Sequence, residues 1–187
     1  MNTTDELALE LSKGKIIFLL LGAIAFVAAS VWMFSLDSET IRKELPFRNP
    51  LLVHGVGIAG MVFFGLGGLI GLRKLLDKKP GLVLNSSGII DNSSGISAGF
   101  IPWSEIVGAE IFQVLHQKTL IIKVKNPEVY IERGNALKRM TNRANYKMSG
   151  SPIAITSNTL KISFPELLSI FERYHRSYAE RMAASGQ

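Results

Sequence analysis

The stretch "IIFLLLGAIAFVAASVWMF", from Ile16 to Phe34, contains nineteen residues and no charge. A second stretch, "LLVHGVGIAGMVFFGLGGLIGL" from Leu51 to Leu72, has His54 as its only ionisable residue. A helix rises about 1.5 Å per residue, so each stretch is long enough to cross a hydrocarbon core of about 30 Å. The sequence therefore predicts a transmembrane hairpin whose helices span residues 16–34 and 51–72.

A cleaved signal peptide is the competing interpretation of the first stretch, because Lys13 and Lys15 precede it and Ala28, Ala29 and Ser30 offer small residues for cleavage. However, the stretch is longer than the usual signal core of about 7–15 residues, and its small residues lie inside it rather than after it. The chain also has 187 residues of which 47% are hydrophobic, which is high for a purely soluble protein. An uncleaved membrane anchor is therefore expected.

The orientation of the hairpin is predicted from the basic residues near its helix ends. The outer flanks carry six of them: Lys13, Lys15, Arg73, Lys74, Lys78 and Lys79. The connector carries three, Arg42, Lys43 and Arg48. Because cytoplasmic flanks are enriched in Lys and Arg, both termini are expected on the cytoplasmic side of a bacterial inner (plasma) membrane.

Small residues predict how the two helices pack. Gly57, Gly60, Gly67, Gly68 and Gly71 share one face of the second helix, which allows close backbone approach. The first helix has a comparable small face, made by Gly22, Ala25, Ala28 and Ala29. We expect a helix–helix seam along these faces, and a homo-oligomer through the glycine face is the related hypothesis. A pore is disfavoured because His54 is the only ionisable residue within the helices.

The segment "LNSSGIIDNSSG", Leu84–Gly95, contains NSSG twice. Asn, Ser and Gly favour turns, so the two copies predict two turns around a short strand over residues 88–91. Both copies also match a glycosylation acceptor, which a cytoplasmic domain would not use, and neither resembles a phosphate-binding loop.

Further strands are predicted over residues 100–115, 118–125, 152–156 and 160–163, with a hairpin turn at 116–117. A C-terminal helix follows, because Ser163 and Glu166 have capping-box spacing and apolar residues recur at helical intervals. These residues are Phe164, Leu167, Leu168, Phe171, Tyr174 and Tyr178. The expected fold class is α+β: a transmembrane hairpin in residues 1–79, then a PH-like antiparallel β-sandwich or barrel in residues 80–187, capped by the C-terminal α-helix.

Four segments, "DKKPGLVLNSSGIIDNSSG", "IPWSEI", "VKNPEVYI" and "NYKMSGSPIAITSNTLKIS", resemble signatures of a family of small, uncharacterised bacterial membrane proteins. That family has two transmembrane helices followed by a cytoplasmic PH-like domain, and the resemblance covers nearly the whole chain. It implies the fold and the membrane placement, and it implies no activity or catalytic residue.

A helical insertion is expected over residues 127–147. Within it, Ala136, Leu137, Met140 and Ala144 form an apolar stripe opposite Lys138 and Asn142. We expect this stripe to pack on the sandwich. The alternative is contact with an anionic membrane surface. The basic residues available for it are Arg73, Lys74, Lys78, Lys79, Lys138, Arg139 and Arg143.

The sequence indicates a non-catalytic protein with no cofactor or metal. His54, His116 and His175 lack metal-ligand spacing, and cysteine is absent. Phosphoinositide recognition is disfavoured because no basic residue occurs from Gly81 to Glu110, and nucleic acid binding is disfavoured because no aromatic residues are interleaved with the basic ones.

The leading hypothesis is a membrane-anchored module that binds a protein or peptide partner by adding a strand to a sheet edge. The alternatives are an immunity-type protein that neutralises a membrane-acting toxin, and a weak anionic-lipid surface sensor.

The excess of basic residues on the outer flanks yields a prediction of topology. A reporter that is active only in the cytoplasm should work when fused after Gln187, and a cysteine introduced by Ser38→Cys should react with a membrane-impermeant reagent added outside intact cells. Labelling of Ser38→Cys only after the membrane is disrupted would reverse the predicted orientation.

Overall fold

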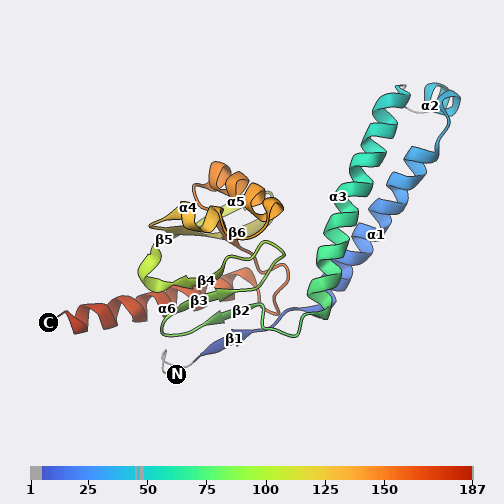
Figure 1. The fold of residues 1–187 in the computed structure, drawn as a ribbon. Helices are drawn as coiled ribbons and strands as arrows, with labels where there is room; N and C mark the ends of the chain where they lie inside the picture. The colour runs from blue at the N-terminus through green and yellow to red at the C-terminus, as the bar shows by residue number, and fades with distance from the viewer. Residues whose placement is uncertain (1–5, 45, 47–48, 187) are drawn as a thin grey trace. The chain divides into compact units, whose positions relative to one another are not determined.

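A computed structural model describes residues 6–44, 46 and 49–186 of the chain, so Arg48 of the connector lies outside the described residues. The structure is α+β, with two long apolar helices and two antiparallel sheets (Figure 1). It divides into two compact units. One is Lys13–Asp77, and the other combines residues 6–12 with residues 78–186.

The first unit is a helical hairpin. Helix α1 spans Lys13–Ser35 and α3 spans Pro50–Leu76, so both predicted stretches are helical, and the short helix α2, Ser38–Glu44, lies between them. Asn49 begins α3 because its side-chain oxygen accepts hydrogen bonds from the Leu51 and Leu52 amides.

The open ends of the two long helices are joined by one side chain. The Nζ atom of Lys13 donates to the carbonyl oxygens of Leu75 and Asp77, each at 2.6 Å, and to that of Lys74 at 3.3 Å. These carbonyls lie at the end of α3, where the helix dipole is negative and the groups lack partners within the helix. The first residue of α1 therefore caps the last turn of α3.

Glycines of α3 approach α1 closely. A Cβ atom built on Gly60 would lie 2.3 Å from the Ser30 hydroxyl oxygen, and one on Gly57 would lie 3.0 Å from the Ser30 carbonyl oxygen. Gly71 faces Leu20 at 3.0 Å in the same way. Any side chain at the tightest of these points would displace the Ser30 hydroxyl, so three of the four predicted packing glycines, Gly57, Gly60 and Gly71, lie in the seam.

Two details of the predicted seam are wrong. A Cβ atom on Gly67 would meet no atom within 4 Å, whereas Gly68 faces Ala23. The predicted small face of α1 also points outward: Gly22, Ala25, Ala28 and Ala29 are exposed. Residues of α1 at heptad spacing face α3 instead: Ile16, Leu20, Ala23, Val27 and Ser30. The reason is that a smooth glycine face needs a ridge of side chains to fill it, since two smooth faces would leave gaps without van der Waals contact.

The second unit begins with a four-stranded sheet in the order β1-β2-β3-β4. Its strands are β1 Leu7–Leu9, β2 Leu82–Leu84, β3 Gly88–Asp91 and β4 Gly99–Pro102. Strand β1 precedes the hairpin in the sequence and pairs antiparallel with β2, which follows it. The predicted boundary had assigned residues 1–79 to the hairpin region and missed this pairing, because the three-residue strand is too short to give a periodic signal.

Residues after β1 extend its contact with the domain. Leu9 and Leu11 are buried, and Leu11 forms a bridge with Leu160. The strand predicted over residues 160–163 is not formed, apart from this bridge at Leu160. Glu10 pairs with Lys161, whose hydrogen bond and positive charge lower the pKa of the Glu10 carboxyl below its ordinary value.

The two NSSG copies flank a strand, as predicted. The Asn85 side-chain oxygen accepts hydrogen bonds from the Ser87 and Gly88 amides, which makes the first turn. Gly88 is required there, because a Cβ atom on it would lie 2.3 Å from the Ile101 carbonyl oxygen of β4. The second copy follows β3 and is organised by Asp91.

A three-stranded sheet in the order β5-β6-β7 completes the strands. They are β5 Ile106–Val114, β6 Gln117–Val124 and β7 Ile153–Ile155, and a short 3-10 helix, η1 Trp103–Glu105, separates β4 from β5. As predicted, Leu120, Ile122 and Val124 are buried. The β5–β6 turn is formed by residues 115–116, one residue earlier than predicted.

Three helices cover the sheets. Helices α4 Pro127–Ile131 and α5 Ala136–Ser149 form the predicted insertion, and Figure 1 shows them on one side of the β5–β6 hairpin, with α6 Phe164–Ser185 on the other. The capping box of Ser163 and Glu166 starts α6. Leu167, Phe171 and Tyr174 bury its apolar face, and the Phe171 ring lies 5.9 Å from that of Trp103.

The pairing of β1 with β2 predicts that residues 80–187 are insufficient for the domain. Without β1 the domain loses the burial of Leu9 and Leu11, which contributes about 1.5–3 kcal/mol each against a total stability of about 5–15 kcal/mol. Residues 6–12 joined by a short Gly/Ser linker to residues 78–187 should melt cooperatively in circular dichroism, whereas residues 80–187 alone should be largely unfolded. Equal melting temperatures for the two chains would contradict the contribution of β1.

The glycine seam predicts a difference between two matched substitutions in α3. Gly60→Leu should force α1 and α3 apart, costing about 1–3 kcal/mol, because its side chain would overlap Ser30. Gly67→Leu adds the same side chain in open space and should be nearly neutral. Thermal unfolding of the full chain in detergent measures the difference, and equal losses at both positions would refute the seam.

Candidate interaction site

The described residues contain no group of three or more His, Cys, Asp and Glu side chains placed to hold a metal ion. The histidines have other contacts. His54 makes a 2.9 Å hydrogen bond with the Leu36 carbonyl oxygen, and the His175 ring stacks on Phe171 at 5.6 Å. His116 lies in the β5–β6 turn.

Asp91 is a buried carboxyl group with a structural role. One oxygen accepts from the Ser93 amide and hydroxyl at 2.9 and 2.6 Å, and the other accepts from the Ala98 amide at 2.7 Å. These three hydrogen bonds satisfy the carboxylate and fix the loop between β3 and β4. The second NSSG copy is therefore a turn built around an acidic side chain, which a phosphate would not approach.

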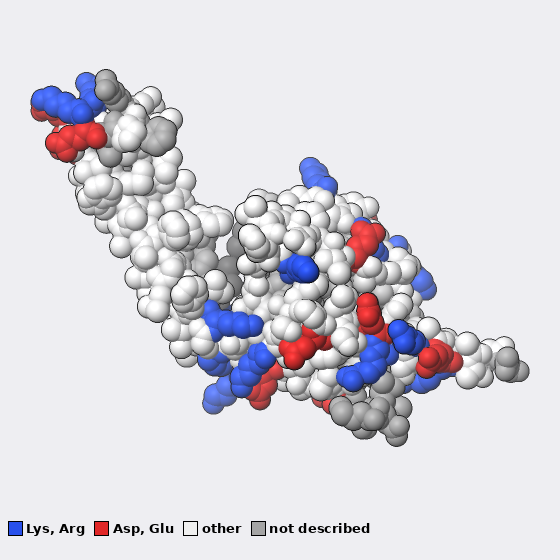
Figure 2. Space-filling view, turned by 180° about the vertical axis from the view of Figure 1, so that it is seen from behind, with Lys and Arg blue, Asp and Glu red and all other residues white. Residues whose placement is uncertain are grey.

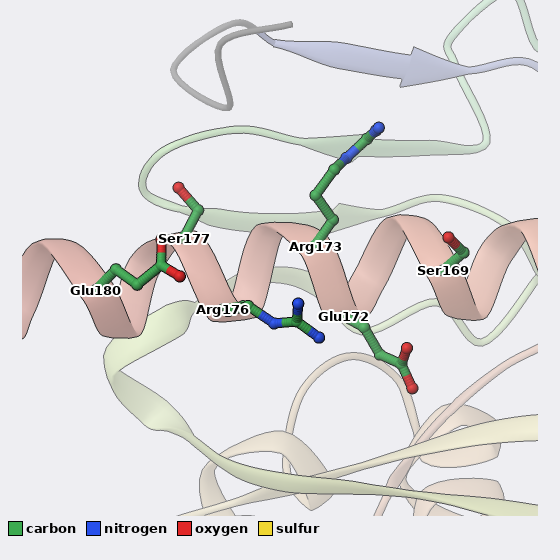
Figure 3. A pocket seen from close by; sticks show the side chains of 6 residues that line it. All are labelled: Ser169, Glu172, Arg173, Arg176, Ser177 and Glu180. Carbon is green, nitrogen blue, oxygen red and sulfur yellow. The ribbon is translucent and has the colours of Figure 1, made fainter.

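A hollow of about 320 Å³ lies on α6 and is lined by Ser169, Glu172, Arg173, Arg176, Ser177 and Glu180 (Figure 3). All of these residues come from one helix. Arg173 and Arg176 point away from each other in Figure 3, so their guanidinium groups do not converge on one ligand position. The hollow is a solvated helix face rather than a built binding site.

The free edge of β4 is closed by two basic side chains. Arg133 donates from Nη1 to the carbonyl oxygens of Ala98 and Phe100, at 3.1 and 3.0 Å. Lys138 donates from Nζ to the Ser97 carbonyl oxygen at 2.5 Å. Lys138, which was predicted as a membrane-surface contact, therefore binds the domain itself. Its direction could not be predicted, because the Ser97 carbonyl comes from a loop forty-one residues earlier in the sequence.

In contrast, the edge of β5 is open. Strand β5 is nine residues long, lies at the end of its sheet, and pairs only with β6 among the strands of the described residues. Val107, Ile111 and Val114 are 49–60% exposed. Glu110 is the one charged residue in the strand. Sheet edges are usually protected by Lys, Pro, bulges or a covering element. The register of β5 shifts between Ile106 and Gly108, so its regular edge runs from Gly108 to Val114. A long, regular, apolar edge of this kind is prone to pair with another strand.

The turn of the β5–β6 hairpin also exposes an apolar side chain. Leu115 is 85% exposed, and its φ of 52° lies in the left-handed region that leucine rarely adopts. The turn therefore keeps a large apolar side chain in solvent at the end of the open strand. Backbone strain of this kind costs roughly 1–3 kcal/mol, and it often accompanies a functional position.

Helix α5 is oriented opposite to the prediction. Its polar side faces the domain, and Asn142 is buried and donates to the Tyr130 carbonyl oxygen at 2.8 Å. The stripe that was expected to pack on the sandwich, Ala136, Leu137, Met140 and Ala144, is exposed. The prediction failed because an apolar stripe is normally assigned to the core, whereas here hydrogen bonds from the polar side hold the helix.

The remaining predicted membrane-surface residues have different surroundings. Arg73, Lys78 and Lys79 are exposed near the end of α3, whereas Lys74 pairs with Asp77 at 3.3 Å. On α5, Arg139 and Arg143 are exposed, and Arg143 pairs with Glu132 of the preceding turn. These two arginines line, with Met140 and Lys147, an open hollow of about 520 Å³ on the outer side of α5.

Comparisons of the chain with protein-family models, curated proteins and solved structures each found no match.

Proposed function

We propose that this protein is a non-catalytic, membrane-anchored interaction module whose PH-like domain binds an extended segment of a partner protein along β5. The observation that carries the proposal is the open edge of β5. Two further features support the membrane anchoring and the PH-like assignment: the apolar surface of the hairpin and the order of the strands.

Membrane anchoring is supported by the surface of the hairpin. Only 11% of the most apolar window of α1 and 6% of that of α3 are buried, whereas the core helix of a soluble protein would be mostly buried. On the face drawn in Figure 2, charged residues gather at the two ends of the hairpin and the length between them carries none. An apolar surface of this extent is far larger than soluble monomers expose, and lipid acyl chains would cover it.

The pairing of β1 with β2 supports the placement of both open ends of the hairpin on one side of the membrane. β1 precedes α1, β2 follows α3, and the Gly81 amide donates to the Leu9 carbonyl oxygen at 2.8 Å. Two strands of one sheet must occupy one compartment, so both open ends of the hairpin belong on the same side of the membrane. With the basic flanks, this side is the cytoplasm.

The PH-like assignment is supported by the strand order. A four-stranded meander, a three-stranded meander and a C-terminal helix follow one another, and α6 buries Leu167 and Phe171 beside Trp103. In this arrangement the membrane hairpin is an insertion between the first two strands, and α4 and α5 are an insertion between the last two.

Strand addition fits β5 better than any other edge. Its regular part, from Gly108 to Val114, offers main-chain hydrogen-bonding groups to an added strand, and its exposed Ile111 and Val114 offer apolar contacts. β4 is closed by Arg133 and Lys138, and β1 and β7 are only three residues long.

Site-specific photocrosslinking in native membranes tests the proposal. A photoreactive residue at Ile111 should give a discrete adduct with a partner protein, and the same residue at Ser169 on α6 should not. Val114→Lys removes one buried valine side chain from the complex, about 1.5 kcal/mol, so the adduct yield at limiting partner should fall about tenfold.

Ser169→Lys is the matched control and should leave the yield unchanged. An adduct that forms equally from Ser169, or that survives Val114→Lys, would contradict strand addition. An adduct made only of two copies of this chain would replace the foreign partner with self-association and would also contradict the proposal.

A further inference from the structure

The outward side of α5 combines an apolar strip and a basic strip. At 100° per residue, the apolar side chains of Leu137, Met140, Ala144 and Met148 fall within an arc of about 80° around the helix axis. Leu137, Met140 and Met148 are 44%, 63% and 68% exposed. The basic strip runs beside them and consists of Arg139, Arg143 and Lys147. The two strips together are typical of a helix that lies in a membrane interface.

The charge of α5 is of one sign. Its fourteen residues include four Lys and Arg and no Asp or Glu. Lys138 is directed at the Ser97 carbonyl oxygen, so the other three basic residues make up the outward charge. The pair of Arg143 and Glu132 does not cancel it, because both side chains are at least half exposed and such surface pairs contribute little.

The helix is also held so that this side remains outward. The buried Asn142 donates to the Tyr130 carbonyl oxygen, Lys138 donates to the Ser97 carbonyl oxygen, and Lys123 of β6 donates to the Ser149 carbonyl oxygen at 2.7 Å. Rotating α5 to bury Met140 would break these hydrogen bonds and expose the domain surface that they cover. The exposed apolar strip is therefore a fixed feature of the fold.

From this charge complementarity we infer that the outward side of α5 docks on anionic lipid headgroups of the membrane that the hairpin crosses. Arg139, Arg143 and Lys147 would contact the phosphates, and Met140, Leu137 and Met148 would enter the boundary between headgroups and acyl chains. The inference rests on the proposed membrane anchoring. Short segments, residues 10–12 and 77–81, join the domain to the hairpin, so lipid is the partner present at high local concentration.

The absence of cysteine from the sequence allows a direct test in the full-length protein. Met140→Cys is labelled with an environment-sensitive fluorophore, and the protein is reconstituted into vesicles whose acyl chains carry bromine as a quencher. The label should be quenched in equal parts phosphatidylcholine and phosphatidylglycerol, and not in phosphatidylcholine alone. Raising the salt from about 0.1 M to about 1 M shortens the Debye length from about 10 Å to about 3 Å and should reduce the quenching.

Two control positions separate docking from anchoring. A label at Phe63→Cys on α3, where the side chain is 72% exposed, should be quenched in both lipid mixtures. A label at Ser169→Cys on α6 should be quenched in neither. Failure at Phe63→Cys would reject the membrane anchor, whereas failure at Met140→Cys with quenching at Phe63→Cys would reject only the docking of α5.

Charge variants test the basic strip. Combining Arg139→Gln, Arg143→Gln and Lys147→Gln with the Met140→Cys label should lower the ratio of docked to undocked protein about 100-fold, because each basic residue contributes about fivefold near an anionic surface. An unchanged circular dichroism spectrum shows that the fold is retained. Quenching that is equal in both lipid mixtures, or that these substitutions do not change, would overturn the inference.

Discussion

The pairing of β1 with β2 is the constraint on which the rest of the structure depends. The two strands are adjacent in the sheet but separated in the sequence by the whole hairpin, Lys13–Asp77. Their hydrogen bonds bring the open ends of α1 and α3 together, and Lys13 reinforces this by capping the last turn of α3. β1 precedes both helices in the sequence and β2 follows them, so the two strands can pair only after both helical segments have been synthesised. A loop of this length also makes the pairing entropically costly, and the burial of Leu9 and Leu11 offsets the cost.

Two sheet edges of the domain have different surroundings: the edge at β4 is covered by basic side chains, and the edge at β5 is exposed. Arg133 and Lys138 extend from the α4–α5 insertion and donate hydrogen bonds to the carbonyl oxygens of Ser97, Ala98 and Phe100. These carbonyl groups are therefore not available to accept hydrogen bonds from an added strand. The same insertion leaves β5 open, with aliphatic side chains along it and Leu115 at its tip. One sheet edge therefore has its carbonyl groups satisfied within the domain, whereas the other keeps an exposed, regular backbone.

Polar residues, rather than apolar ones, attach α5 to the domain. Asn142 and Lys138 donate hydrogen bonds on its inner side, and the Ser149 carbonyl oxygen accepts one from Lys123 of β6. No buried side-chain polar atom among the described residues lacks a partner. In α4 of the insertion, burial raises the pKa of the Tyr130 phenol, and the centre of its ring lies 4.0 Å from the Arg133 guanidinium carbon. Because the polar contacts hold the helix, its apolar side chains are available for contacts outside the domain.

The sequence by itself determined the local elements whose signals lie within a few residues. The uncharged stretches became α1 and α3, the NSSG copies became turns around β3, and the capping box of Ser163 and Glu166 began α6. Tertiary structure alone decided the partner of β1, the side of α3 that faces α1, and the side of α5 that faces the domain. Each of these depends on atoms distant in the sequence: Leu9 meets Leu82, Gly60 meets Ser30, and Lys138 meets Ser97. Periodicity shows that a helix has two sides, but the side that packs is set by which neighbours can satisfy its hydrogen bonds and fill its surface.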